Sequence, residues 1–486
     1  MFVMFIAMIF ALYYHQVILS PEPVTGTNLL AMVFLPRLAV GFLYLLLTRM
    51  TLRRLATPQA AAAMSWLDRI GKLYHAGVLF LFISDLRNGL LLAVRQFLGS
   101  DWVLVDEIIV LLPSLVLIFW GWVCFYPVDR RLREASLMRR LDQGLPPMTL
   151  CTRGQYVLNQ LRHQVLVVLI PLLALYGGNE VVDRLPESWV MYNGWNLSSV
   201  FSFAVAGILL LFSPVMLRYL WDTEPLPAGP LRESLEQLCQ THGVKVRRLL
   251  LWRTYGTLIN AAVMGLIAPI RYIMLTDALL ENMPQRQVEA VMAHEVAHVR
   301  RRHLIWLVLA AAALLMGLES ILVIVLKSLI HSPALPGMFG QFHELIQDPV
   351  MLDRSAMLIG LVLWFLSFGW VSRRFERQAD TFAVQHLSMQ YGKHVDPQLG
   401  LVVDPASAVA MIEALQRLAN LNHLSVHRNS WRHGSIRWRQ TYLESLIGRP
   451  VHQLPIDDQI LWMKAATVVV LLAGLIFELY RRGFIA

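Results

Sequence analysis

Charged residues are scarce in this chain. Asp, Glu, Lys and Arg make up 15% of its 486 residues, whereas hydrophobic residues make up 56% and the mean hydropathy is +0.53. A soluble domain carries about 25% charged residues, so the composition excludes an ordinary soluble enzyme and indicates a multi-spanning membrane protein. Cysteine is also rare. Cys124, Cys151 and Cys239 are odd in number and lack metal-like spacing, which excludes a disulfide framework.

Basic residues outnumber acidic ones, with 42 Lys and Arg against 33 Asp and Glu, for a net charge of +9. In a chain this apolar, basic residues more often mark the cytoplasmic ends of membrane helices than a nucleic-acid surface. The sequence contains no basic motif or stacking platform, so we expect no nucleic-acid partner. The first residues lack a basic n-region and a cleavage site, which predicts a retained helix rather than a cleaved signal.

Nine apolar stretches approach the length of about 20 residues that a spanning helix needs. They lie near residues 1–19, 27–48, 73–98, 103–125, 164–178, 197–221, 304–330, 355–372 and 464–480. The loops 49–72 and 126–163 are rich in arginine, and alternation from them places residues 222–303 in the cytoplasm. The excess of arginine over lysine adds the expectation of a bacterial inner membrane.

Charged residues also fall inside these apolar stretches, among them Arg37, Asp85, Arg87 and Glu319. A charge within the hydrocarbon layer is costly and usually faces protein or water. Two interpretations remain open for them. They either pair with one another for structure or line a polar chamber that leads to the metal site described below.

The polar section 222–303 has the pattern of a mixed α and β domain. "GPLRESLEQLCQTHG" predicts an amphipathic helix that ends at Gly243, and the stretches 244–252, 257–265 and 271–276 predict strands. A helical pattern follows, which Pro284 interrupts and restarts. The second polar section, 373–463, is predicted to be mainly helical with a loop at 392–404.

The second half of the restarted helix contains His294-Glu295-x-x-His298. Positions four apart lie on one face of a helix, so both imidazoles can bind one tetrahedral zinc ion. Glu295 is offset to the side, where it can take a proton from the attacking water instead of binding the metal. The motif therefore predicts a zinc hydrolase.

The third ligand must come from elsewhere in the chain. His303 lies on the opposite side of a straight helix from His294 and is expected to be structural. The bent-helix arrangement with a third histidine is excluded because Arg301 and Leu304 occupy the positions of its glycine and histidine. Two apolar stretches return the chain to the same side of the membrane.

Glu376 and Asp380 follow that return, in "SRRFERQADTFAV". An i, i+4 acidic pair suits one zinc ligand and one carboxylate that orients a ligating histidine from behind. We therefore expect one Zn2+ ion per chain on His294, His298 and Glu376, with Asp380 as the supporting residue.

The motif HExxH, an apolar hairpin and then ExxxD resembles the membrane-embedded gluzincin metallopeptidases, which comprise HtpX-like stress proteases and type I CAAX prenyl proteases. "TLINAAVMG" is similar to the family's Asn-Ala strand, and "HGSIRWRQTYL" is similar to a later motif, with Gly434 in place of its proline. The resemblance covers roughly residues 225–445. It implies that His433 stabilises the oxyanion, that Arg439 orders its own segment or the substrate, and that Asn260 supports substrate bound along "RYIML".

The expected fold is an α-helical polytopic membrane protein with a cytoplasmic-side α+β gluzincin-type zinc metallopeptidase domain that a transmembrane hairpin splits. The expected parts are a six-helix membrane domain, the first metallopeptidase part, the hairpin, the second metallopeptidase part and a last transmembrane segment, at 1–221, 222–303, 304–372, 373–463 and 464–486.

The expected function is zinc-dependent cleavage of membrane-associated or misfolded proteins, with the lipid bilayer as the other partner. A dedicated processor of one substrate class, such as prenylated C-termini, remains open. A scaffold or transporter with a structural zinc site is a third hypothesis, but such sites are usually closed by Cys and His ligands and have no use for Glu295.

Overall fold

The computed structural model describes residues 2–13, 27–55, 57, 60–99, 102–142, 150–192, 195–196, 198–255, 258–330, 349–392, 395–396, 398–422 and 424–481. The chain divides into two compact units, Met1–Thr223 and Glu224–Ala486. The sequence placed a boundary between residues 221 and 222.

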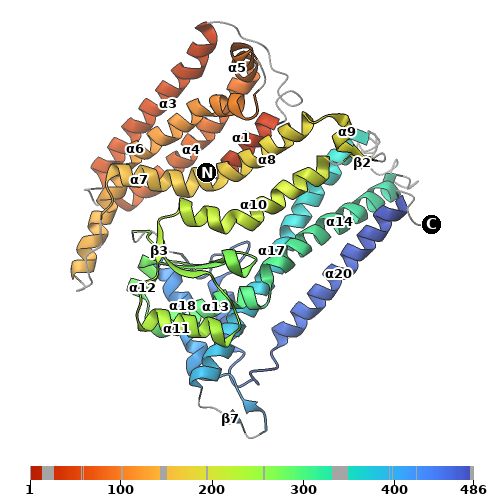
Figure 1. The fold of residues 1–486 in the computed structure, drawn as a ribbon. Helices are drawn as coiled ribbons and strands as arrows, with labels where there is room; N and C mark the ends of the chain where they lie inside the picture. Colours follow the sequence, from red (N-terminus) through yellow and green to blue (C-terminus); the bar gives the residue numbers. More distant parts are fainter. Residues whose placement is uncertain are drawn as a thin grey trace. The chain divides into compact units, whose positions relative to one another are not determined.

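The first unit is built almost entirely of helices (Figure 1). Its elements are α1 (Phe2–Tyr13), α3 (Thr27–Arg54), α4 (Ala60–Arg87), α5 (Leu90–Leu98), α6 (Val105–Asp142), α7 (Arg153–Gln160), the π-helical turn η1 (Leu161–Leu166), α8 (Val167–Asp183), α9 (Glu187–Val190), β1 (Met191–Tyr192), β2 (Trp195–Asn196) and α10 (Ser198–Leu220).

Among the described residues, five helices are long and apolar enough to cross a membrane. Two further pairs of helices, each bent at a short break, bring the number of spans to seven if each pair counts as one span. The expected stretch 73–98 is one of these pairs, because α4 and α5 meet at an angle of 58°. The break lies at Gly89, whose φ of 78° is a left-handed conformation that favours glycine. The chain is a multi-pass membrane protein, although these spans do not reproduce the expected number of nine.

Two of the charges inside the first unit's apolar helices, Arg37 and Asp85, are paired. Both Nη atoms of Arg37 bind the Asp85 carboxylate, and Nη2 also donates to Ser114 Oγ at 3.1 Å. Both charged side chains are buried. Arg87 is exposed, and the side chain of Glu319 lies outside the described residues. For Arg37 and Asp85 the structure therefore supports the first interpretation, a structural ion pair.

The second unit combines a small sheet with several helices (Figure 1). Its strands are β3 (Thr223–Pro225), β4 (Arg248–Trp252), β5 (Ala261–Met264), β6 (Tyr272–Thr276), β7 (Val395–Asp396) and β8 (Gly400–Leu401). Its helices are α11 (Pro230–Thr241), the short 3-10 helix η2 (Ala268–Ile270), α12 (Asp277–Asn282), α13 (Gln285–Arg300), α14 (His303–Ile330), α17 (Pro349–Tyr391), α18 (Pro405–Leu421), α19 (Ile436–Glu444) and α20 (Pro455–Arg481).

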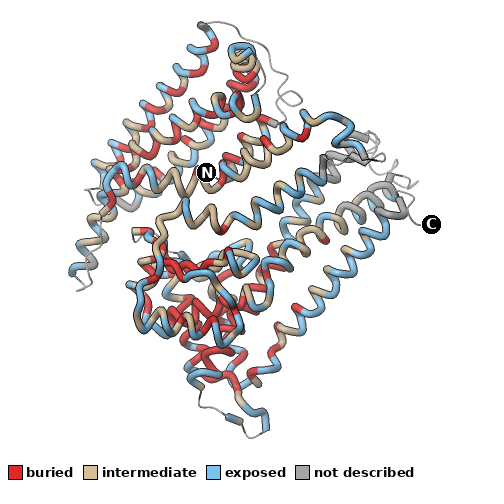
Figure 2. Tube along the Cα trace, viewed as in Figure 1, coloured by how far each residue is buried: buried red, intermediate tan, exposed pale blue. Residues whose placement is uncertain are grey.

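The predicted mixture of strands and helices is confirmed here. Gly243 ends α11 with a φ of 63°, and Pro284 separates α12 from α13. The buried residues of this unit concentrate around the sheet and around α13, α18 and the second half of α17 (Figure 2). In α14 and α20, by contrast, large apolar side chains are exposed, as expected for helices that face lipid.

The four-stranded sheet has the order β3-β4-β6-β5. Strand β6 pairs in parallel with β4 and antiparallel with β5, and its five residues are buried. The expectation that substrate binds along "RYIML" is therefore wrong, because both hydrogen-bonding edges of that strand are already occupied. The open edge next to α13 belongs to β5, which contains the Ala-Ala of the Asn-Ala stretch.

Candidate metal centre

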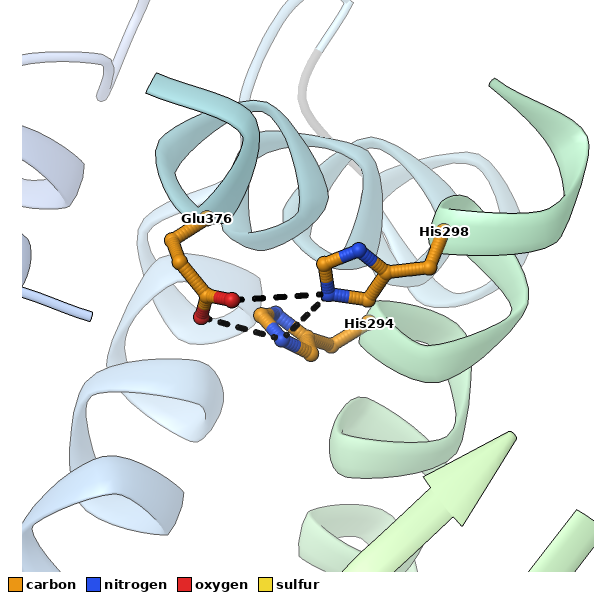
Figure 3. A group of neighbouring side chains, drawn as sticks. All are labelled: His294, His298 and Glu376. Atoms are coloured by element: carbon orange, nitrogen blue, oxygen red, sulfur yellow. Dashed lines mark hydrogen bonds and ion pairs between the residues drawn. The ribbon is translucent and has the colours of Figure 1, made fainter. Parts of the chain in front are cut away.

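Two ligands of the expected metal site come from α13 and the third comes from α17 (Figure 3). His294 Nε2 and His298 Nε2 are 3.2 Å apart, and the Glu376 carboxylate oxygens lie 3.6 and 3.8 Å from them. A tetrahedral zinc site with bonds of about 2.0–2.1 Å has edges of roughly 3.3–3.4 Å. The donor atoms and their spacing therefore fit zinc.

Small residues allow the two helices to approach closely enough for this geometry. Ala293 and Ala297 of α13 and Ala379 and Ala383 of α17 are fully buried, and α13 packs along α17. Because helix axes approach more closely where the contact side chains are small, the carboxylate of Glu376 can reach the imidazoles of the facing helix.

His294 is held from behind by a buried ion pair. Its Nδ1 lies 2.9 Å from Asp380 Oδ1. Arg439, on α19, donates to both oxygens of Asp380 at 2.6 and 2.5 Å, and its Nη1 lies 3.6 Å from Glu376 Oε2. With Nδ1 facing a carboxylate, the Nε2 lone pair of His294 points toward the metal position.

Both carboxyl groups are held in the ionised form. Burial raises the pKa of Asp380, but the Arg439 guanidinium and the contacts from Arg439 and His294 outweigh it and hold that pKa below its ordinary value. Burial likewise raises the pKa of Glu376, and the contact with His433 and the charge of Arg439 hold it well below the ordinary value. Glu376 must be ionised to bind a metal cation, because a protonated carboxyl group carries no negative charge.

His298 is oriented by a separate chain of hydrogen bonds. Its Nδ1 lies 2.9 Å from His303 Nδ1, and His303 Nε2 lies 2.9 Å from Gln378 Oε1. Gln378 Nε2 in turn donates to Asp457 Oδ1 at 2.5 Å.

These contacts determine the tautomers. Because the amide nitrogen of Gln378 donates to Asp457, its oxygen faces His303 and accepts from Nε2–H. Nδ1 of a neutral His303 is then an acceptor, so His298 donates from Nδ1 and its Nε2 carries the lone pair. Asp457, Gln378 and His303 together orient the second histidine ligand.

The metal position opens into a cavity of about 490 Å³. Glu295 lines this cavity beside the ligands, and its Oε2 accepts a hydrogen bond of 3.2 Å from the backbone N–H of Val263. Asn260, which directly precedes β5, lines the same cavity. Its carbonyl accepts a hydrogen bond from the Thr276 N–H, and its own N–H donates to Thr276 Oγ1.

His433 also reaches the site. Its Nδ1 lies 3.0 Å from Glu376 Oε2, and its side chain is 52% exposed. Ser430 and Gly434 exchange backbone hydrogen bonds of 3.2 and 2.9 Å, which closes a tight turn that presents His433. Gly434 has a φ of 73°, a conformation that proline cannot adopt, which accounts for the glycine at this position.

The structure thus brings His294, Glu295, His298, Glu376 and His433 to one cavity. It also places Asp380, Arg439 and Asn260 around them, so every site residue expected from the sequence lies here. Sequence analysis missed the supporting roles of three residues, which are His303, Gln378 and Asp457. His303 is noticeable beside the motif, but its contact with Gln378 depends on how α17 is rotated, for which the sequence carries no signal.

Comparisons with known proteins agree with this geometry. Residues 225–402 match the model of peptidase family M48. The chain is 25% identical to CAAX prenyl protease 1 of Saccharomyces cerevisiae over 232 residues, which cover 44% of this chain and 49% of that protein. It is 30% identical to the protease HtpX homologue of Aeropyrum pernix over 143 residues, 27% of this chain and 44% of the relative. The chain therefore spans about half the length of these curated relatives.

A solved structure, Ste24p of S. mikatae, is also similar. The match has 16% identity and a TM-score of 0.44, and it covers 86% of this chain and 99% of the other.

Replacing Asp380 with Asn tests the support of His294. The change leaves Arg439 buried without its main partner and weakens the acceptor behind Nδ1. We expect zinc affinity to fall roughly 10- to 100-fold, as is typical when the partner of a ligating histidine is lost. Competition with a chromophoric chelator measures it. Asp458, which is exposed on α20, provides the matched control: Asp458→Asn should keep the wild-type affinity.

Replacing Gln378 with Leu tests the chain behind His298. Without the amide oxygen, nothing selects the tautomer of His303. We expect zinc affinity to fall roughly tenfold, which is the lower end of the range for residues that support a metal ligand. Gln385 lies on the same helix, is equally buried and donates to a backbone carbonyl at 2.7 Å. If Gln385→Leu lowers zinc affinity as much as Gln378→Leu, the effect is one of packing and the orienting role is refuted.

Proposed function

Because residues 225–402 belong to peptidase family M48, we propose that this membrane protein is a zinc-dependent endopeptidase. The observation that carries the proposal is the arrangement of the cavity. Three protein ligands converge on one position, and a carboxylate and an open strand edge lie beside it. A three-ligand site leaves a coordination position for water or substrate, which is typical of catalytic zinc.

His294, His298 and Glu376 would hold the zinc ion. A zinc ion bound there supplies Lewis-acid polarisation of the substrate carbonyl and increases the acidity of water. The residues that contact these ligands from behind fix the direction of each ligand before the metal binds, so the ligand side chains need little rearrangement on binding.

Glu295 acts as the general base and then as the proton donor. Glu295 forms no hydrogen bond with the described residues that support either histidine ligand. Its carboxylate accepts a hydrogen bond from the backbone N–H of Val263, which holds it in the cavity without binding the metal. It takes a proton from the attacking water and passes it to the departing amine. The hydrogen bond from the Val263 N–H fixes the orientation of the carboxylate through Oε2, and Oε1 makes no hydrogen bond to Val263.

In this proposal, His433 stabilises the oxyanion. A peptide carbonyl attacked by water develops a negative charge that needs a donor in addition to the metal. The exposed ring of His433 lies over the cavity on its closed turn, and its contact with Glu376 holds it on the ligand side. Arg439 also lines the cavity, and its guanidinium contacts Asp380 and Glu376, which supports the role of ordering the site.

The substrate adds a strand to the open edge of β5. Asn260 and Thr276 are joined by a backbone hydrogen bond, so alternate residues of β5 from Asn260 onward face β6. Ala261 and Val263 therefore direct their backbone groups outward, and the bond from Val263 to Glu295 has that direction. An extended peptide paired there passes directly in front of Glu295.

Substrates of this site are membrane-associated or misfolded proteins. The cavity that contains the metal position is also lined by Leu304 and Leu307, in the first turns of the apolar helix α14. Arg300, Arg301 and Arg302 precede that helix, and such residues usually lie at the cytoplasmic interface. The site would then meet peptide where it leaves the bilayer, on the cytoplasmic side.

Glu295→Gln tests the catalytic proposal. The amide cannot accept the proton, so we expect the cleavage rate of an unfolded reporter protein to fall roughly 10²- to 10⁴-fold. Zinc content should remain at that of the wild type, because Glu295 is not a ligand. Glu444→Gln, on the exposed face of α19, is the control for the loss of one carboxylate. Cleavage that persists in Glu295→Gln would refute the assignment of the base.

N-methylation of a peptide substrate tests the binding mode. Once a cleaved sequence is identified in the reporter, peptides are made with one backbone N–H methylated at each position in turn. A strand added to β5 uses alternate N–H groups, so we expect KM to rise at every second position and to change little between them. A uniform effect along the peptide would contradict strand addition.

A further inference from the structure

A second cavity lies in the apolar part of the second unit, between α14, α17 and α20. It has a volume of about 470 Å³. Its walls are almost entirely apolar and include Ala310, Leu314, Phe375, Ala466 and Val470. Since α14 and α20 expose large apolar side chains along their length, this groove faces the hydrocarbon layer.

The basic side chain of Lys464 lies at one end of the groove with unused hydrogen-bonding capacity, and Arg301 lies next to it. Lys464 lines the groove, and the only hydrogen bond of its ammonium among the described residues goes to the Arg301 carbonyl at 3.5 Å. No carboxylate of the described residues lies within 4.0 Å of this ammonium. Arg301 Nε is buried and has no hydrogen-bond partner.

Among the described residues, the acid within 4.0 Å of Arg301 is Asp457, and it does not satisfy these donors. Asp457 Oδ1 lies 3.6 Å from Arg301 Nη2, but the same oxygen accepts the 2.5 Å hydrogen bond from Gln378. Three tryptophans line this end of the groove, and the Lys464 ammonium lies 5.2 Å from the centre of the Trp306 ring. Trp370 and Trp462 are partly exposed, as aromatic residues at the membrane surface usually are.

An apolar groove that ends at a cationic, tryptophan-lined mouth is complementary to one class of molecule. We propose that it binds an anionic phospholipid, with the phosphate group on Lys464 and Arg301 and an acyl chain along α14 and α20. A neutral lipid would fill the groove but leave the cationic donors unsatisfied in an apolar setting, which is costly. A free anion would satisfy the donors but leave the groove to be filled by other chains.

The lipid would lie next to the metal centre. Phe375 forms part of the walls of both cavities and directly precedes the ligand Glu376. The inference does not rest on peptidase activity, because it concerns binding of lipid by the whole chain and is measured without substrate.

The test uses the full-length protein purified in detergent and exchanged into mixed micelles that contain phosphatidylglycerol and phosphatidylcholine. Bound phospholipid is identified and counted by native mass spectrometry. We expect the wild type to retain phosphatidylglycerol in preference to phosphatidylcholine. Lys464→Gln should weaken retention of phosphatidylglycerol roughly fivefold, which corresponds to about 1 kcal/mol for one basic residue. Lys72→Gln removes an equally charged, exposed residue of the first unit and should have no effect.

A second pair of variants tests the acyl chain. Ala465 and Ala466 are neighbours on α20 and both are exposed, but only Ala466 lines the groove. Ala466→Phe should fill the groove and prevent retention, whereas Ala465→Phe should retain lipid like the wild type. Both positions are exposed, so neither change disturbs the core.

Three results would overturn the proposal. The first is a wild type that retains no phospholipid or shows no preference for the anionic one. The second is retention that Ala466→Phe leaves intact, which would mean that the groove holds no acyl chain. The third is displacement of the lipid by inorganic phosphate, which would identify a simple anion site.

Discussion

The buried ion pair between Arg439 and Asp380 is the interaction on which the metal centre depends. Glu376 and Asp380 are one helical turn apart on α17 and both are buried, so without a cation each would disfavour ionisation of the other. Arg439 contacts both, at 2.5–2.6 Å and 3.6 Å. It thereby keeps Glu376 anionic as a ligand and Asp380 anionic as the acceptor behind His294. One guanidinium from α19 thus sets the direction of the first ligand and, together with the contact from His433, keeps the third ligand anionic.

The second histidine is supported by different elements. His303 begins α14, Gln378 is on α17 and Asp457 is in the first turn of α20, so the orientation of His298 depends on how the apolar helices pack. The two histidine ligands of α13 are therefore oriented by two separate sets of residues. His294 relies on a buried salt bridge within the polar part of the unit. His298 relies on a chain of hydrogen bonds that ends at Asp457, on the helix α20 of the proposed lipid groove.

The proximity of His294, His298 and Glu376 was predictable because it is local or follows from a simple topological argument. Two histidines four residues apart share a helix face in any helix. Glu376 follows a pair of apolar stretches that must return the chain to the same side, which leaves few other candidates. Gly434 was visible as a departure from the family's motif, but its left-handed φ, which explains the departure, appears only in the structure.

Other features were not predictable, because they depend on how distant elements pair. The sequence shows three strands but not their order, and β6 rather than β5 was expected at the open edge. That order is decided by the parallel pairing of Leu249 with Ile273 and its neighbours, which is a long-range contact. In the same way, nothing in "ERQAD" distinguishes Gln378, which faces His303, from a solvated residue. The bend between α4 and α5 was not predictable either, since apolar composition alone does not reveal where a helix bends.

The most direct test of the central claim, that three oriented ligands hold zinc with one open position, is X-ray absorption spectroscopy at the zinc edge of the purified protein. The account predicts one zinc ion per chain with only nitrogen and oxygen neighbours at about 2.0–2.1 Å, of which two are imidazoles. Glu376→Ala should lose a carboxylate oxygen from this shell and bind zinc more weakly. A sulfur neighbour at about 2.3 Å, or a shell unchanged in Glu376→Ala, would contradict the ligand set.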